Sequence, residues 1–187
     1  MKTIQNVVLV NEQDVALGKM EKLEAHIRGE LHRAFSIFIF NSEGELLLQK
    51  RADEKYHSGG LWTNTCCGHP NPGEVITSAA AKRLNEEMGM LCDLKFGFKF
   101  LYKENVGNHL TEHEVDHVFF GISNELPEIN EDEVSAYRYV SLEELKDEMN
   151  DVPDTFTEWF KIIYEKAFDF FSVTEKFLTK STAEKLT

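Results

Sequence analysis

The stretch that most constrains the fold of this chain covers residues 61–90, LWTNTCCGHPNPGEVITSAAAKRLNEEMGM. In its second half an apolar residue recurs at every fourth position: Ile76, Ala80, Leu84 and Met88. This spacing places the four side chains on one face of a helix and predicts that the helix packs against the core. Gly89 follows directly and predicts the end of the helix, because glycine readily adopts the left-handed conformation of a C-terminal cap.

Charged side chains lie beside this apolar face. At about 100° per residue, Arg83 and Glu87 fall one turn apart at its border. Lys82 and Glu86 lie further round, toward solvent. A side chain at such a border is anchored by the core and still reaches into a cleft. We therefore expect Arg83 and Glu87 to contribute to a site.

Apolar runs elsewhere predict strands and further helices around this central helix. The strand-like runs cover residues 4–10, 34–40, 46–51, 94–103, 113–122 and 134–140. The second and third of them flank Gly44 and predict a β-hairpin. We expect residues 20–33 to form an irregular or helical segment that covers the rest of the fold. Ser141 and Glu144 have the spacing of a capping box, and apolar residues recur at helical spacing over residues 156–171.

These elements predict an α+β fold, an α/β/α sandwich of mixed sheets and helices. The length of 187 residues and the hydrophobic content of 42% suit a single domain over residues 1–187. The tail over residues 172–187 is polar and is expected to fray.

Charge and composition exclude several classes of protein. The net charge of −13 counts against a nucleic-acid partner, which usually requires a basic face. No apolar run approaches the roughly 20 residues that a membrane span needs. The three cysteines give no disulfide framework, and the N-terminus turns polar too soon for a secretion signal. We therefore expect reduced thiols, no membrane partner and a cytoplasmic location.

Histidines and paired glutamates offer candidate metal ligands. Glu112 and Glu114 are two residues apart, so on a strand both carboxylates point to one face. With three histidines they form the candidate group His26, His32, His69, Glu112 and Glu114. Imidazole and carboxylate ligands together suit Zn, Mn or Mg. The alternatives are an ordinary surface or core role for each histidine, or competing ligands at His57, His109, His113 and His117.

Two further groups carry candidate chemistry. The first is cationic and consists of Lys22, Arg51, Lys55 and Arg83, with Glu87 nearby. It offers the local positive charge that an anionic substrate needs in so acidic a protein. The second group consists of Cys67, Tyr102, Glu114 and Trp159. The alternatives are solvated charges for the first group, and for the second an inert buried cysteine, a cross-strand tyrosine and a core tryptophan.

The spacing of the central stretch resembles a known motif. From Gly68 it reads G-x5-E to Glu74, then seven residues, then K-R-L-x-E-E-x-G-M. This resembles the box of the Nudix family, G-x5-E-x7-R-E-U-x-E-E-x-G-U with U apolar. Where Nudix hydrolases typically keep a metal-binding glutamate, this chain has Arg83. The change removes a ligand and adds a cation with bidentate phosphate geometry, which favours holding a diphosphate over cleaving it.

Two other motifs narrow the resemblance to isopentenyl diphosphate isomerase of type 1, a Nudix-fold family. TNTCCGHP resembles its T-N-x-x-C-G-H-P signature, and TEHEVDHVF resembles its second motif, which contains E-x-E. The segments LHRAFS, LLLQKRADEK and RLNEEMG and a late tryptophan follow in the family's order. The resemblance covers about residues 3–165.

The resemblance implies an isomerase that interconverts isopentenyl and dimethylallyl diphosphate through a tertiary carbocation, in isoprenoid biosynthesis. Cys67 and Glu114 match the acid and the base on opposite sides of the substrate. Tyr102 matches an assisting tyrosine, and Trp159 matches the indole that stabilises the carbocation.

The resemblance also implies the binding groups. A divalent metal (Mn, Zn or Mg) would be held by His26, His32, His69, Glu112 and Glu114. The substrate diphosphate would be bound by Lys22, Arg51, Lys55 and Arg83, with Mg bridging it to Glu87. The partner is thus a small isoprenyl diphosphate, and the protein is expected to be a monomer or a homodimer. Two alternatives stay open: a Nudix hydrolase of a diphosphate substrate, and a metal-stabilised binding domain in which neither Cys67 nor Trp159 matters.

Overall fold

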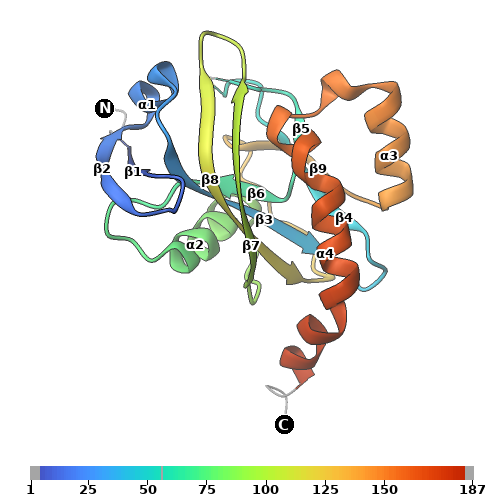
Figure 1. The fold of residues 1–187 in the computed structure, drawn as a ribbon. Coiled ribbons are helices and arrows are strands. Elements are labelled where there is room, and N and C mark those ends of the chain that lie inside the picture. The colour runs from blue at the N-terminus through green and yellow to red at the C-terminus, as the bar shows by residue number, and fades with distance from the viewer. Residues whose placement is uncertain (1–4, 56, 184–187) are drawn as a thin grey trace.

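The computed structural model describes residues 5–55 and 57–183 (Figure 1). Helices separate three runs of consecutive strands, and the described chain ends with helices. Their order is β1 (Asn6–Val10), β2 (Ala16–Glu21), α1 (Lys22–Arg28), β3 (His32–Phe40), β4 (Leu46–Arg51), β5 (Trp62–Thr63), β6 (Cys66–Gly68), α2 (Ile76–Met88), β7 (Lys95–Asn105), β8 (Thr111–Ile122), β9 (Val134–Val140), α3 (Leu142–Asp151), the 3₁₀ turn η1 (Pro153–Thr155) and α4 (Glu158–Ala183).

Strand β3 lies at the centre of the sheet. It pairs in parallel with β8 along its whole length and antiparallel with β6, so that Ser36 lies opposite Cys67. On the far side of β8, antiparallel β7 brings Tyr102 opposite Glu114. Strand β4 pairs with β5 and β9. The register therefore places strands that are distant in sequence side by side in one sheet.

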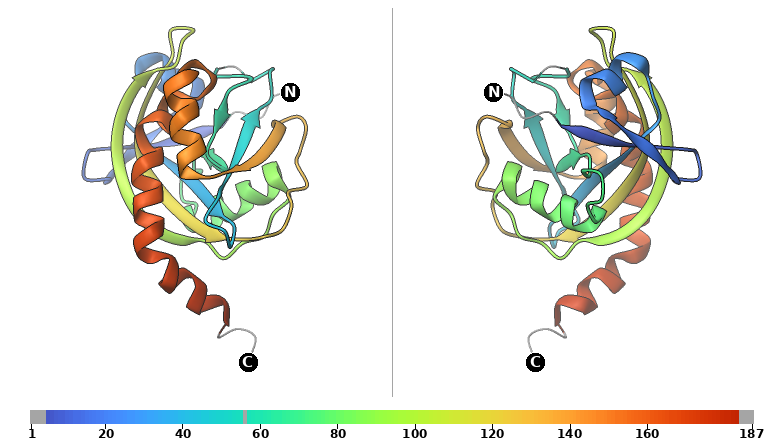
Figure 2. Two further views of the ribbon diagram at one scale, coloured as in Figure 1. Left: turned by 90° about the vertical axis from the view of Figure 1, so that its right-hand side faces the viewer. Right: turned by 90° about the vertical axis from the view of Figure 1, so that its left-hand side faces the viewer.

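The side chains of β3 alternate between two hydrophobic cores, because successive residues of a strand point to opposite faces. Phe38 and Phe40 pack with residues of α3 and α4. Ile37 and Ile39 pack with the apolar face of α2. Figure 2 shows α2 and α4 on opposite sides of the sheet. The fold is thus the predicted α+β sandwich, with helices on both faces of a mixed sheet.

Several local predictions are confirmed. Helix α2 covers Ile76–Met88 and ends at Gly89, whose φ of 63° is left-handed. Strand β9 has the predicted bounds. At the start of α3, Ser141 and Glu144 form both hydrogen bonds of the capping box. Within residues 5–55 and 57–183, no helix combines the length and apolarity needed to cross a membrane.

The predicted hairpin around Gly44 is wrong for most of its length. Strands β3 and β4 share only the pair Phe40–Leu46 near the turn. Beyond it β3 runs beside β8 and β6, while β4 runs beside β9 and β5. Both strands are buried on both faces, so their apolar runs fit several partners equally well, and the local pattern does not select one.

The segments at the two ends also differ from expectation. Residues 20–33 form the end of β2, a short helix and the start of β3, rather than continuous cover. Helix α4 begins at Glu158, because Phe156 instead forms a buried bridge with Trp62. The tail predicted to fray from Ser172 continues α4 to Ala183. Residues 184–187 of that tail lie outside the described residues.

Candidate active site

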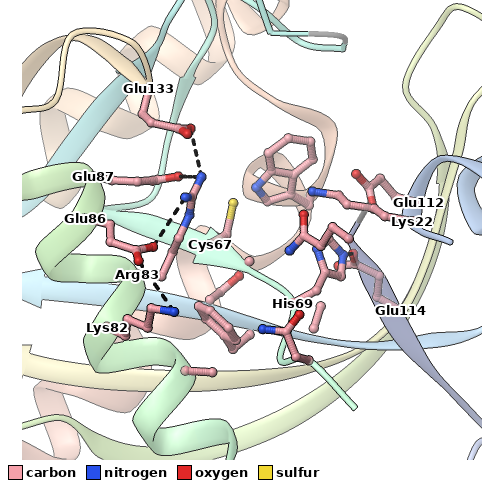
Figure 3. A pocket seen from close by; sticks show the side chains of 18 of the residues that line it. Lys22, Cys67, His69, Lys82, Arg83, Glu86, Glu87, Glu112, Glu114 and Glu133 are labelled. Atoms are coloured by element: carbon pink, nitrogen blue, oxygen red, sulfur yellow. Dashed lines mark hydrogen bonds and ion pairs between the residues drawn. The ribbon is translucent and has the colours of Figure 1, made fainter. Parts of the chain in front are cut away.

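One cavity of about 630 Å³ collects the predicted site residues (Figure 3). Helices α1, α2 and α4, strands β3, β4, β6, β7 and β8, and the loop after β4 all contribute to its lining. The predicted catalytic and diphosphate-binding residues all line it: Cys67, Tyr102, Glu114, Trp159, Lys22, Arg51, Lys55, Arg83 and Glu87. The folded chain therefore brings together all three groups that the sequence singled out.

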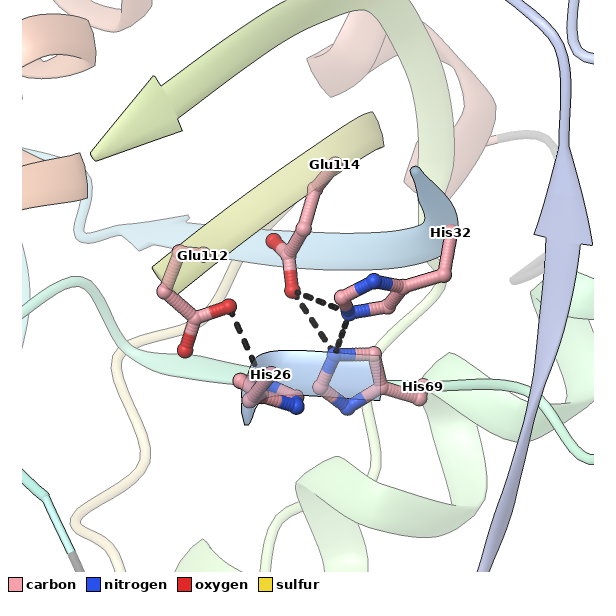
Figure 4. A group of neighbouring side chains, drawn as sticks. All are labelled: His26, His32, His69, Glu112 and Glu114. Atoms are coloured by element: carbon pink, nitrogen blue, oxygen red, sulfur yellow. Dashed lines mark hydrogen bonds and ion pairs between the residues drawn. The ribbon is translucent and has the colours of Figure 1, made fainter. Parts of the chain in front are cut away.

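The predicted metal ligands lie together at one end (Figure 4). Each of the five residues offers a ligand atom, and all five atoms lie within 4.8 Å of one another: His26, His32, His69, Glu112 and Glu114. The histidines come from α1, from the start of β3 and from the turn after β6, and both carboxylates come from β8.

The local folding of the chain orients these imidazoles. Nδ1 of His26 donates to the carbonyl of Lys22 at 2.6 Å, and Nδ1 of His32 donates to the carbonyl of Glu30 at 2.8 Å. Because a carbonyl only accepts, Nδ1 carries a proton in each case, and Nε2 of each ring faces the group.

The residues present fit a divalent metal. Nε2 of His32 and Nε2 of His69 lie 3.2 Å apart. The Oε1 atom of Glu114 lies 2.7 Å from His69 Nε2 and 3.4 Å from His32 Nε2. Burial lowers the pKa of His69 well below its usual range, which disfavours a proton as the shared cation. Facing nitrogens and a carboxylate in a buried site are the donor set of Zn, Mn or Mg.

Glu114 connects this metal-ligand group to the cavity. Its Oε2 accepts a hydrogen bond of 2.6 Å from the Tyr102 hydroxyl, while its Oε1 faces the histidines. Burial opposes its charge, but the hydrogen bond from His32 and the other bonds bring its pKa down to about 2. Burial, together with the charge of Glu114, raises the pKa of Tyr102 well above its usual range. A neutral phenol therefore lies against an ionised carboxylate.

The adjacent cysteines face opposite sides of the sheet. Cys67 lines the cavity, whereas Cys66 is fully buried in the core beneath α2 and donates to Glu87 Oε2 at 3.3 Å. Burial raises the pKa of Cys67 to about 12, although Arg51 acts in the other direction. At neutral pH the thiol of Cys67 is therefore protonated, and it is the thiol that can reach a ligand in the cavity.

Trp159 is a core residue that also lines the cavity. The indole extends from α4, is only 4% exposed and packs in the core, yet it also lines the cavity. Its Nε1–H donates to Oδ1 of buried Asn64 at 3.3 Å, which fixes the plane of the ring. The guanidinium carbon of Arg51 lies 5.4 Å from the ring centroid, so a cation already lies beside this indole.

Carboxylates hold the cations at the cationic end of the cavity, the part lined by Lys55 and Arg83. Arg83 Nη2 lies 2.5 Å from Glu87 Oε1 and 2.8 Å from Glu133 Oε2. Burial opposes the charge of Arg83, but Glu87 and the other nearby acidic groups together outweigh it and raise the pKa. Burial lowers the pKa of Lys55 to about 8. Oε2 of buried Glu87 accepts from the Gln49 amide at 2.9 Å, which orients the carboxylate.

Among the competing histidines, only His57 lies beside the metal-ligand group. Its Nε2 is 3.2 Å from Glu112 Oε1. His113 contacts the carbonyl of Gly29, and His117 contacts Asp14. His109 lies in the loop between β7 and β8, with a φ of 59°.

Sequence reasoning missed three residues that orient the site: Gln49, Asn64 and Glu133. Asn64 has a local signal, because it stands in the TNTCCGHP motif beside Cys67. Gln49 likewise stands in the LLLQKRADEK segment and reaches the site from β4, whereas Glu133 reaches it from the turn before β9, and no pattern in the sequence links Glu133 to the site.

Comparison with known proteins identifies the class that this fold and site define. The model of the NUDIX domain matches residues 30–160. The chain therefore belongs to the Nudix family and, within it, to the isopentenyl-diphosphate Delta-isomerases. It is 52% identical over 167 residues to the isopentenyl-diphosphate Delta-isomerase of Pectobacterium atrosepticum, covering 89% of this chain and 93% of that relative. It is also 52% identical to isopentenyl-diphosphate Delta-isomerase 2 of Photorhabdus laumondii, covering 84% of this chain and 89% of that relative.

Solved structures share the fold at lower identity. A protein from Deinococcus radiodurans superposes with a TM-score of 0.71 at 17% identity, covering 87% of this chain and 98% of its own. A MutT protein from Methanosarcina mazei superposes with a TM-score of 0.60 at 22% identity, covering 74% of this chain and 93% of its own. These likenesses concern the fold alone.

Proposed function

We propose that this protein is the isomerase that interconverts isopentenyl diphosphate and dimethylallyl diphosphate in isoprenoid biosynthesis. The observation that carries the proposal is the lining of the cavity. A protonated thiol, Cys67, and an ionised carboxylate, Glu114, line one cavity that several cations line as well. An allylic double-bond shift needs this combination, because one proton is added, another is removed and no electrons are exchanged.

Cys67 and Glu114 carry the two proton transfers. One group protonates an alkene carbon and the other removes a proton two carbons away, from opposite sides of the substrate. Because the reaction is reversible, the group that donates in one direction accepts in the other. Tyr102 assists by keeping its hydroxyl on Glu114 Oε2. A divalent metal on the five His and Glu ligands would hold Glu114 and set its protonation.

Trp159 stabilises the tertiary carbocation between the two transfers. An indole face contributes ~2 kcal/mol or more to a desolvated cation. Buried aromatic side chains, among them Tyr102 and Trp159, line the same cavity and keep water away from the carbocation.

The diphosphate binds against the cations that line the cavity, Lys22, Arg51, Lys55 and Arg83. Glu87 would hold the Mg that bridges to the diphosphate. We propose Mn, Zn or Mg at the His and Glu group, a cytoplasmic location, and a monomeric or homodimeric protein whose partner is this small substrate.

Incubation of the purified protein with Mg and isopentenyl diphosphate in D₂O tests the function. We expect dimethylallyl diphosphate to form and to carry deuterium at the protonated carbon, as measured by NMR. Release of inorganic phosphate or diphosphate without isomerisation would contradict the proposal and favour a Nudix hydrolase.

A further inference from the structure

Glu133 lies at the cationic end of the cavity and has no part in the mechanism above. It is the residue immediately before β9. Its Oε2 atom contacts two of the four proposed diphosphate ligands, Lys55 through Nζ and Arg83 through Nη2 at 2.8 Å. In Figure 3, the guanidinium of Arg83 is joined to both Glu87 and Glu133. One carboxylate oxygen thus connects two cations.

The backbone around Glu133 joins the elements that carry these cations. The carbonyl of Glu133 accepts from the amide of Ala52 at 3.0 Å, where the Lys55 loop begins. Three residues earlier, the amide of Asn130 donates to the carbonyl of Glu87 at 2.9 Å, near the end of α2. The turn is therefore fixed to both elements, and the carboxylate of Glu133 does not have to move in order to reach Lys55 and Arg83.

The two cations depend on Glu133 to different degrees. Arg83 is also held by Glu87, a buried carboxylate that Gln49 orients. For Lys55, Glu133 is the only ion-pair partner within residues 5–55 and 57–174. Burial lowers the pKa of Lys55 and so opposes its ammonium; the charge of Glu87 acts in the other direction, and those of Arg51 and Arg83 add to the effect of burial. Without Glu133, the flexible and strongly hydrated Lys55 side chain is expected to turn to solvent.

We propose that Glu133 is a positioning residue for the diphosphate, one that holds Lys55 against Arg83 so that both meet the substrate at a fixed spacing. Two nitrogens that share one oxygen are separated by no more than about two hydrogen-bond lengths, roughly 6 Å. Such a pair suits two phosphoryl groups joined through a bridging oxygen better than it suits a single phosphate. Glu133 thus contributes to the preference for a diphosphate, a role that rests on the proposed function for the identity of the substrate.

Glu133→Gln tests this role, because it keeps the shape of the side chain and removes its charge. Calorimetric titration with inorganic diphosphate in the presence of Mg should show a roughly tenfold weaker Kd, the effect of losing one hydrogen bond between charged groups. The Kd for inorganic phosphate should change less than twofold. In turnover, KM for isopentenyl diphosphate should rise about tenfold while kcat stays within twofold, because Glu133 contacts the diphosphate ligands Lys55 and Arg83 rather than Cys67 or Glu114.

Glu86→Gln is the matched control. Glu86 lines the same cavity, and its carboxylate lies 3.7 Å from Arg83 Nη1, but its other partner is Lys82 rather than Lys55. We expect Kd and KM within twofold of the wild type. An equal loss in both variants would mean a general effect of removing negative charge and would overturn the proposal. Tighter diphosphate binding in Glu133→Gln would also overturn it, because Glu133 would then be a competing anion.

Glu133→Asp keeps the charge on a shorter side chain. Diphosphate affinity between those of the wild type and Glu133→Gln supports the positioning role, whereas a loss as large as that of the glutamine variant contradicts it. The outcomes separate this role from the proposed function. If the wild type isomerises its substrate while Glu133→Gln binds diphosphate normally, only the positioning role is wrong. If Glu133→Gln weakens diphosphate binding and the wild type does not isomerise, only the function is wrong.

Discussion

The substitution Trp159→Leu tests the proposed stabilisation of the carbocation. The indole lines the cavity, is fixed by Asn64 and already lies beside the guanidinium of Arg51. A leucine keeps the site apolar but has no aromatic face. If that face contributes about 2 kcal/mol to the carbocation, kcat should fall about 30-fold, since each 1.36 kcal/mol corresponds to a factor of ten.

The same substitution also lowers stability, and a matched variant separates the two effects. Trp159 is buried, so the smaller leucine should cost about 2–3 kcal/mol of unfolding free energy. Phe160 is the next residue of α4; it is fully buried and does not line the cavity. Phe160→Leu should therefore lower the free energy of unfolding by a similar amount while leaving kcat within about twofold of the wild type.

The assay is steady-state kcat, measured well below the unfolding midpoints of both variants, with thermal unfolding recorded in parallel. Trp159→Phe adds a third point, because phenylalanine offers a weaker aromatic face, and its kcat should lie between those of the wild type and Trp159→Leu. Equal kcat values for Trp159→Leu and Phe160→Leu would refute the reasoning and leave Trp159 as a core residue only.

Three further predictions concern the proton-transfer groups, the cationic end and the metal-ligand group. Cys67→Ala and Glu114→Gln should each lower kcat by about 10²–10⁴-fold with an unchanged circular dichroism spectrum, and near-normal turnover in either would remove that residue from proton transfer. Burial lowers the pKa of Lys55 to about 8, so its ammonium is charged below that pH and neutral above it. The pH profile of kcat/KM should therefore fall as pH rises through the pKa of Lys55, the fall should shift to higher pH in Lys55→Arg, and identical profiles would contradict the role of this charge. His69→Ala should lower the metal content found by elemental analysis, whereas His113→Ala, whose ring contacts the Gly29 carbonyl, should retain it; unchanged metal in the first variant would exclude His69 as a ligand.

The parts of the fold that were predictable from the sequence depend on neighbours in the chain. The apolar spacing of α2, the left-handed glycine at its end and the capping box of α3 are all set within a few residues. The candidate residues came from short motifs of the same kind. The sequence motif also placed Cys67 rather than Cys66 at the site, and the alternation along β6 supplies the physical reason, since one thiol faces the cavity and the other the core.

The parts that were not predictable depend on partners distant in sequence. Strand β3 has an apolar pattern that fits a hairpin with β4 as well as its parallel pairing with β8, and only the assembled sheet decides between them. The contacts of Asn64 with Trp159 and of Glu133 with Lys55 and Arg83 span large sequence separations in the same way. Hydrogen bonds of this kind follow from the tertiary fold and carry no local periodicity.

Position 83 shows why the fold alone does not determine the reaction. The solved MutT protein shares this sandwich at 22% identity, so the scaffold by itself leaves the reaction open. In this chain, the guanidinium of Arg83 lies on Glu87 Oε1, while Gln49 and Cys66 donate to Glu87 Oε2. Where Nudix hydrolases typically keep a metal-binding carboxylate, this helix presents the cation of Arg83 beside the carboxylate of Glu87. A cation of this kind can stabilise a bound diphosphate but does not activate a water molecule, and the proposed function therefore assigns the proton transfers to the thiol of Cys67 and the carboxylate of Glu114.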